Sequence, residues 1–102
     1  MKTYKGRRNH NGIEVTVLDT NTNEETPLTH IVKHSPTGFE WGYGGSGPAD
    51  LALSILADTV GYKTAQNFYQ IFKWEIVANF PYEEWQITEE EIKEFLKQKG
   101  AL

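Results

Sequence analysis

The residues best suited to binding chemistry lie in one glycine-rich, aromatic segment, residues 38–48, with the sequence Gly-Phe-Glu-Trp-Gly-Tyr-Gly-Gly-Ser-Gly-Pro. We call this segment the glycine-aromatic loop. Its glycines lack a Cβ, so the backbone can take positive φ angles and approach a ligand closely. A helix is expected to follow, and its start offers the unpaired N–H groups of Ala49, Asp50 and Leu51 together with the positive end of the helix dipole. This combination is typical of a cradle for phosphate or another anion.

Several side chains near this loop would complete an anion-binding site. Trp41 or Tyr43 can stack on a nucleobase, and the Ser46 hydroxyl can donate to a phosphate oxygen. Arg7 or Arg8 can balance negative charge, and His34 lies four residues before Gly38. The predicted ligand-binding residues are Arg7, Arg8, His34, Trp41, Tyr43, Gly44, Gly45, Ser46, Gly47, Ala49 and Asp50.

Two features of the segment argue against a simple phosphate site. No Lys-Ser or Lys-Thr pair follows the last glycine, so the segment is not a Walker P-loop. A negative charge at Asp50 in the first helical turn would repel an anion unless it bound a ribose hydroxyl or pointed away. A purely structural interpretation stays open, in which the segment is a tight strand-to-helix connection whose aromatic residues belong to the core.

The sequence supports a metal site or a catalytic site less well than it supports anion binding. His30 and His34 would be separated by about 13 Å along an extended strand, too far apart to ligate one metal ion, and we expect neither a metal nor a cofactor. The acidic residues near the C-terminus are explained by helix capping. A serine hydrolase remains an alternative, with Ser46 as nucleophile and His34 as base, although Pro48 replaces the last glycine of the Gly-x-Ser-x-Gly pattern.

Composition narrows the possible partners. The chain has 102 residues and no cysteine, which fits one domain spanning residues 1–102 without disulfides. A net charge of −4 argues against sequence-independent nucleic-acid binding. No apolar run approaches the length of a membrane span, and the first residues do not resemble a signal peptide. We therefore expect a cytoplasmic protein that contacts neither nucleic acid nor membrane.

The N-terminal third is expected to form a sheet. Residues 3–9 and 13–19 alternate as two strands around an Asn-Gly turn, followed by a polar loop over 20–27. We predict a third strand at 28–34 and a short fourth strand at 39–41.

Helical patterns dominate the rest of the chain. Pro48 suits the first position of a helix that Gly61 would end. A second helix should start near Thr64 and run toward Asn79. The third should start at Thr88, whose side chain and that of Glu91 match a capping box. The predicted fold is α+β, an N-terminal antiparallel sheet of three to four strands followed by three helices.

Residues 34–53 resemble the signature of a family of small bacterial and phage proteins described only as a domain of unknown function. The signature pattern GFEWGYGGSGPxxLALxIL begins at Gly38 and continues to Leu56. The resemblance extends to Tyr4-Lys5-Gly6, Phe72-Lys73-Trp74 with Val77, and Trp85-Gln86-Ile87-Thr88. It implies an accessory protein of phages or mobile elements, a setting in which small proteins often antagonise host defence.

The leading functional hypothesis is a non-catalytic protein that sequesters an anionic, nucleotide-like small molecule, such as a host-defence signal. We expect a homo-oligomer, because small domains form deep pockets most easily between subunits. One alternative is an inhibitor that binds a host defence protein through its acidic third helix and exposed aromatics. The second alternative is the small hydrolase.

Overall fold

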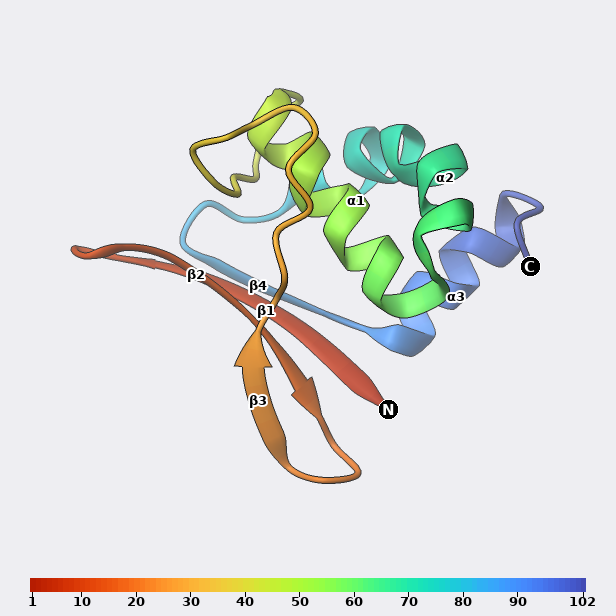
Figure 1. The fold of residues 1–102 in the computed structure, drawn as a ribbon, viewed down its shortest axis with the longest axis horizontal. Coiled ribbons are helices and arrows are strands. Elements are labelled where there is room, and N and C mark those ends of the chain that lie inside the picture. Colours follow the sequence, from red (N-terminus) through yellow and green to blue (C-terminus); the bar gives the residue numbers. More distant parts are fainter.

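The computed structural model describes all 102 residues. A four-stranded antiparallel sheet forms one layer of the molecule. The strands are β1 (Lys2–Asn9), β2 (Gly12–Asp19), β3 (Glu24–Pro27) and β4 (Glu84–Thr88). Their order across the sheet is β3-β2-β1-β4, so the two longest strands lie in the middle (Figure 1). The predicted β1–β2 hairpin is confirmed, with Asn9 opposite Gly12 at its tip.

Alternating side chains decide which face of the sheet is covered. Tyr4, Val15 and Val17 are buried, whereas Arg7 and Glu14 are exposed on the other face. This two-residue period is the one expected of a sheet packed on one side only.

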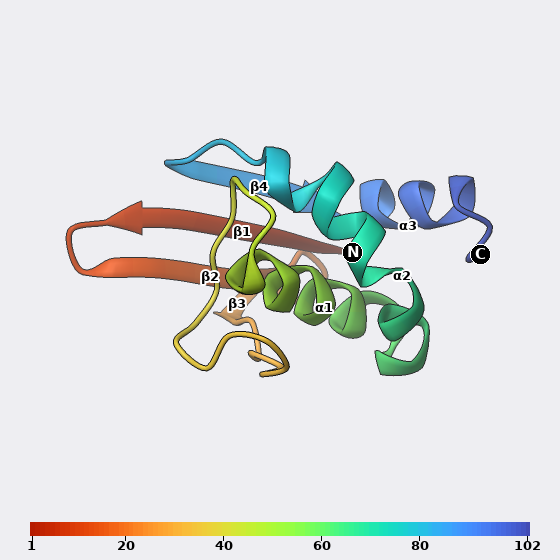
Figure 2. The same cartoon turned by 90° about the horizontal axis from the view of Figure 1, so that it is seen from above.

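Three helices cover the buried face, as both views show (Figures 1 and 2). They are α1 (Ser46–Val60), α2 (Tyr62–Glu75) and α3 (Glu89–Gln98), with a short 3₁₀ helix at Val77–Asn79. Helix α1 lies at the centre, and every residue from Gly47 to Leu56 in it is buried. Twenty buried hydrophobic residues form one cluster between the two layers, and the predicted α+β class is confirmed.

The helix ends follow the sequence signals within a few residues. Gly61 ends α1 with φ of 92°, a conformation that favours glycine. The Thr88–Glu91 capping box is present in both directions. Helix α1 begins at Ser46, so Pro48 is its third residue rather than its first, and α2 begins two residues before Thr64 and ends at Glu75.

Two strand predictions were wrong. Residues 28–34 and 39–41 form no strand, whereas β3 lies within the predicted loop at Glu24–Pro27. Side chains of α1 explain the difference, because they take the place of a neighbouring strand. The Ser54 hydroxyl accepts from the Ile31 N–H, and Asp50 accepts from the N–H groups of residues 33–35.

The fourth strand comes instead from the C-terminal half. β4 pairs with β1 and places Trp85 opposite Gly6 and Ile87 opposite Tyr4. Trp85 and Ile87 are buried while Glu84 and Gln86 are exposed. That alternation is visible in the sequence, but it spans only five residues.

None of the helices has the length and apolar character needed to cross a membrane.

Candidate functional site

The glycine-aromatic loop leads directly into α1, whose N-cap is Gly45. No side chain caps this helix, and the N–H groups of Ser46 and Gly47 form no hydrogen bond within the protein. The N–H of Ala49 is already bonded to the Gly45 carbonyl at 3.1 Å. The free donors are therefore those of Ser46 and Gly47, not those of residues 49–51, because the helix starts two residues earlier than predicted.

A cavity of about 680 Å³ opens beside this helix start. We call it the hairpin–loop cavity. It is bounded by the β1–β2 hairpin, by the segment 30–40 and by the glycine-aromatic loop, and it is lined by Arg8, Asn9, Gly12, Ile13, Val15, His30, Ser35, Thr37, Gly38, Phe39, Glu40, Tyr43, Ser46 and Gly47. Four of the predicted ligand-binding residues, Arg8, Tyr43, Ser46 and Gly47, thus meet at one cavity.

The two aromatic residues of the loop have different environments. Trp41 is 1% exposed, packs edge-on against Trp85, and donates its indole N–H to the Tyr82 carbonyl at 3.0 Å. It is a core residue and has no free ring face for a ligand. Tyr43 is 52% exposed and lines the cavity, so it is the one of the pair able to stack on a bound molecule.

Arg8 lies in the wall of the cavity with its charge balanced. Its guanidinium binds both carboxylate oxygens of Glu40, with Nη1 3.0 Å from Oε2. It also lies 4.5 Å from the Trp41 ring and 4.0 Å from the Tyr82 ring. The hydrogen bond from Arg8 outweighs burial and holds the pKa of Glu40 below its usual range. Arg8 therefore joins β1 to the loop and adds no net charge to the cavity.

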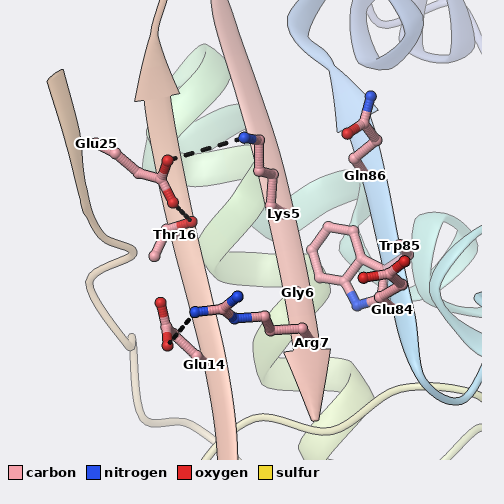
Figure 3. Close-up of a pocket in the computed structure, with 9 residues that line it drawn as sticks. All are labelled: Lys5, Gly6, Arg7, Glu14, Thr16, Glu25, Glu84, Trp85 and Gln86. Atoms are coloured by element: carbon pink, nitrogen blue, oxygen red, sulfur yellow. Dashed lines mark hydrogen bonds and ion pairs between the residues drawn. The ribbon is translucent and has the colours of Figure 1, made fainter. Parts of the chain in front are cut away.

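Arg7 lies on the opposite face of the sheet. Figure 3 shows it in a shallow groove of about 760 Å³ on the uncovered face. Arg7 pairs with Glu14 at 3.4 Å, and Lys5 approaches Glu25 at 3.8 Å. Since each cation there faces a carboxylate and most of these groups are well exposed, the groove is a solvated sheet surface of mixed charge. It does not bring Arg7 to the hairpin–loop cavity.

Asp50 is fully buried and points away from the helix start, toward the segment 30–35. It accepts hydrogen bonds from the backbone N–H groups of His34 and Ser35, each at 2.9 Å, and from Lys33 N–H. The His30 Nε2 lies 2.9 Å from its Oδ2. Burial acts to raise the pKa of Asp50, but these hydrogen bonds outweigh it and hold the pKa below the usual range. The carboxylate fixes one cavity wall and does not face a ligand at Ser46.

His34 does not lie where the sequence placed it, near the glycine-aromatic loop. The His34 ring lies on α2, with Nε2 2.8 Å from the Tyr69 hydroxyl, and it does not line the cavity. The cavity therefore does not bring His34 together with Ser46, as the hydrolase alternative required. His30 lines the cavity instead. The sequence contains no signal for this, because the position of His30 depends on a bond to a helix twenty residues later.

Lys73, from α2, contacts the glycine-aromatic loop, a role that the sequence analysis did not predict. It is buried, donates to the Gly44 carbonyl at 3.3 Å and lies 4.4 Å from the Trp74 ring. A Cβ at Gly44 would lie 2.2 Å from that ring, so a larger residue there would require the Trp74 side chain to move. Trp85 is buried, whereas Trp74 is 58% exposed.

No cluster of three or more acidic or histidine side chains is arranged to hold a metal ion. The model of a family of unknown function, DUF6166, matches residues 4–98. The chain belongs to this family. The match confirms the resemblance to a small domain-of-unknown-function family and includes the loop, the hairpin and all three helices. Searches of curated proteins and of solved structures found no match.

Proposed function

We propose that this protein is a non-catalytic accessory protein that binds and sequesters an anionic, nucleotide-like small molecule in the hairpin–loop cavity. The observation that carries the proposal is the convergence of Tyr43, Ser46 and Gly47 on one cavity. Tyr43 offers an exposed ring for stacking on a base. Ser46 and Gly47 offer free N–H groups at the positive end of α1, where phosphate binds well.

The cavity offers groups that can bind a ligand, but its side chains are not arranged as a nucleophile beside a base. Ser46 has no hydrogen-bonded base, and the Arg8 charge is balanced by Glu40. A protein that sequesters its ligand needs slow release and no chemical step. A phage or mobile-element protein that removes a host-defence signal in the bacterial cytoplasm would work in this way, and assembly into a homo-oligomer would deepen the open cavity.

The test is a binding measurement with purified protein. Calorimetry and thermal shift with a panel of cyclic nucleotides and ADP-ribose-type nucleotides should reveal at least one ligand. Tyr43→Ala should then weaken binding about tenfold, since stacking on an aromatic ring is worth about 1–3 kcal/mol per base. Tyr62→Ala is the matched control, because Tyr62 is similarly exposed at the start of α2 and does not line the cavity. A panel with no ligand at all would contradict the proposal.

A second candidate is the inhibitor of a host defence protein, favoured by one specific observation. Tyr43, Trp74 and Tyr82 are 52%, 58% and 67% exposed. Tyr43 belongs to the glycine-aromatic loop, and Trp74 and Tyr82 border it. Exposed Tyr and Trp residues are the side chains that most often dominate protein interfaces. The acidic helix α3 lies at the other end of the molecule (Figures 1 and 2), so it would not share this surface.

One substitution separates the two candidates. Trp74 does not line the hairpin–loop cavity but packs against Gly44, so Trp74→Ala should weaken nucleotide binding much less than Tyr43→Ala does if the small-molecule proposal holds. The same substitution should reduce retention of a stoichiometric protein partner from a host lysate at least tenfold if that partner binds the exposed aromatics.

A further inference from the structure

His30 is the only histidine that lines the hairpin–loop cavity, and it is held on two sides. Its Nε2 lies 2.9 Å from the buried Asp50 carboxylate. Its ring also packs on Phe39, with 4.5 Å between the ring centroids. Because a bond and a ring contact both fix the imidazole, its remaining nitrogen, Nδ1, has a defined position before any ligand arrives.

The partners of Asp50 determine which nitrogen of His30 carries the proton. Asp50 accepts from three backbone N–H groups besides His30. Hydrogen bonds to the charged form keep this carboxylate ionised, and an ionised carboxylate can only accept hydrogen bonds. The Nε2 atom of His30 must therefore be the donor, and the neutral ring has an acceptor at Nδ1.

This acceptor is free and accessible. His30 forms no hydrogen bond through Nδ1, since its only polar contact is the one to Asp50. The only buried side-chain nitrogen or oxygen without a partner is the indole Nε1 of Trp85. The unpaired Nδ1 of His30 is consequently open to solvent rather than enclosed in the core.

Net charge does not determine what the cavity selects. Arg8 and Glu40 are the charged residues that line it, and they neutralise each other. Donors for an anionic group are the N–H groups of Ser46 and Gly47, which also line the cavity. Matching of hydrogen-bond donors and acceptors is then what distinguishes one ligand from another, as it does in other sites with polar groups in fixed positions.

We propose that His30 is the specificity-determining residue of this cavity, and that its Nδ1 accepts a hydrogen bond from a hydroxyl or amino group on the nucleoside part of the ligand. This inference rests on the proposed function. It places the nucleoside at the His30 wall and the phosphate at Ser46, because an unprotonated phosphate oxygen has no hydrogen to donate to Nδ1. The ligand class is thus a nucleoside phosphate with a free sugar hydroxyl or base amine.

The test uses adenosine 5′-phosphate, the unit that ADP-ribose and cyclic adenosine nucleotides share, in calorimetric titrations at pH 8. Two analogues each remove one kind of donor: the 2′,3′-dideoxy form lacks both sugar hydroxyls, and purine riboside 5′-phosphate lacks the base amine without gaining another donor. The wild-type protein should bind one analogue about three- to tenfold more weakly than adenosine 5′-phosphate, the effect of one hydrogen bond. The analogue affected identifies the donor.

His30→Gln is the decisive variant. Its amide nitrogen can occupy the place of Nε2 and still donate to Asp50, while the acceptor at Nδ1 is removed. It should bind adenosine 5′-phosphate about three- to tenfold more weakly and no longer distinguish the two analogues, with unchanged affinity for inorganic phosphate. Loss of the ring contact with Phe39 should lower its unfolding temperature slightly. His34→Gln is the matched control, because His34 does not line the cavity, and it should retain full discrimination.

Unchanged affinity and discrimination in His30→Gln would overturn the inference and leave the proposed function intact. The same follows if the nucleotide panel contains a ligand but adenosine 5′-phosphate does not bind. If no member of that panel binds, the proposed function fails and this inference fails with it.

Discussion

The indole of Trp85 lies across Gly6, its partner on the neighbouring strand, and occupies the space that any larger residue at position 6 would need. A Cβ built at Gly6 would lie 2.4 Å from the indole ring. Trp85 cannot move away easily, because it stacks on Phe80 at 4.3 Å and meets Trp41 edge-on at 5.6 Å. The glycine in β1 is thus required by packing rather than by its φ angle.

We therefore expect Gly6→Ala to destabilise the fold by about 1–3 kcal/mol, the usual cost of inserting a methyl group into a packed core. Urea unfolding measures this directly. Lys5→Ala, one residue away on the uncovered face, should change stability by less than about 0.5 kcal/mol. Equal stability of Gly6→Ala and wild type would show that the Trp85 indole can shift without cost.

Arg8 should not tolerate replacement by lysine. Lysine keeps the positive charge, but it loses the paired bonds to Glu40 and the flat stacking between Trp41 and Tyr82. We expect Arg8→Lys to lower the free energy of unfolding by about 1–2 kcal/mol. Arg7→Lys is the control, because Arg7 is exposed on the outer face, and it should be neutral in the same thermal-unfolding assay. A neutral Arg8→Lys would mean that the ion pair and the stacking contribute little.

Asp50 predicts how the fold responds to acid. Its pKa is lowered in the folded state, so the unfolded chain binds the proton more readily and stability falls as the pH drops below about 4. Asp50→Asn should lose about 2–4 kcal/mol at pH 7, because its amide group presents hydrogens to backbone N–H donors. It should also show a weaker dependence on pH between pH 5 and pH 2 than wild type.

Asp19→Asn, at the end of β2 where the turn begins, provides the comparison for this acid response. Its stability should follow the wild-type curve across the same pH range. If Asp50→Asn retained the full wild-type acid dependence, other carboxylates would have to be responsible for it.

Tyr4 predicts the response to alkali, with the opposite sign. Burial and the neighbouring Asp58 raise the pKa of its hydroxyl above the ordinary value. The unfolded tyrosine therefore loses its proton first, so the stabilisation is complete below about pH 10 and is lost as the pH rises beyond it. Tyr4→Phe should lose about 1 kcal/mol at pH 7, from its bonds to Asp58 and Thr59.

Above pH 10 the difference between Tyr4→Phe and wild type should shrink, because phenylalanine has no proton to release. Urea unfolding at pH 7, 9 and 11 follows this convergence. A constant difference across that range would contradict the assignment to Tyr4.

Local signals in the sequence were sufficient for the parts of the fold that depend on near neighbours. The Asn-Gly turn placed the β1–β2 hairpin, Gly61 ended α1, and Thr88 with Glu91 started α3. Each of these features involves residues within a few positions of one another. These local signals were therefore enough to predict the fold class, but not the arrangement of the site.

The segment 28–45 could not be predicted, because its hydrogen bonds go to side chains far along the chain. Ile31 and Val32 have the composition of a strand, yet Asp50 and Ser54 on α1 satisfy the backbone nearby. The same long-range bonds place His30 at the cavity and His34 on α2. Sequence spacing alone contains no information about such pairings, which is why it pointed to His34 rather than to His30 as the histidine near the loop.

The segment 30–35 has no regular secondary structure, and one carboxylate on α1 accepts three of its amide hydrogens. These hydrogens should therefore exchange with solvent together rather than one by one, whenever that single attachment opens. Their exchange rate therefore measures how often the segment 30–35 separates from Asp50 and opens this side of the cavity. A ligand that binds between the segment 30–35 and the hairpin should slow the exchange of these three amide hydrogens together. Hydrogen exchange at residues 33–35 can therefore detect a ligand before its chemical identity is known.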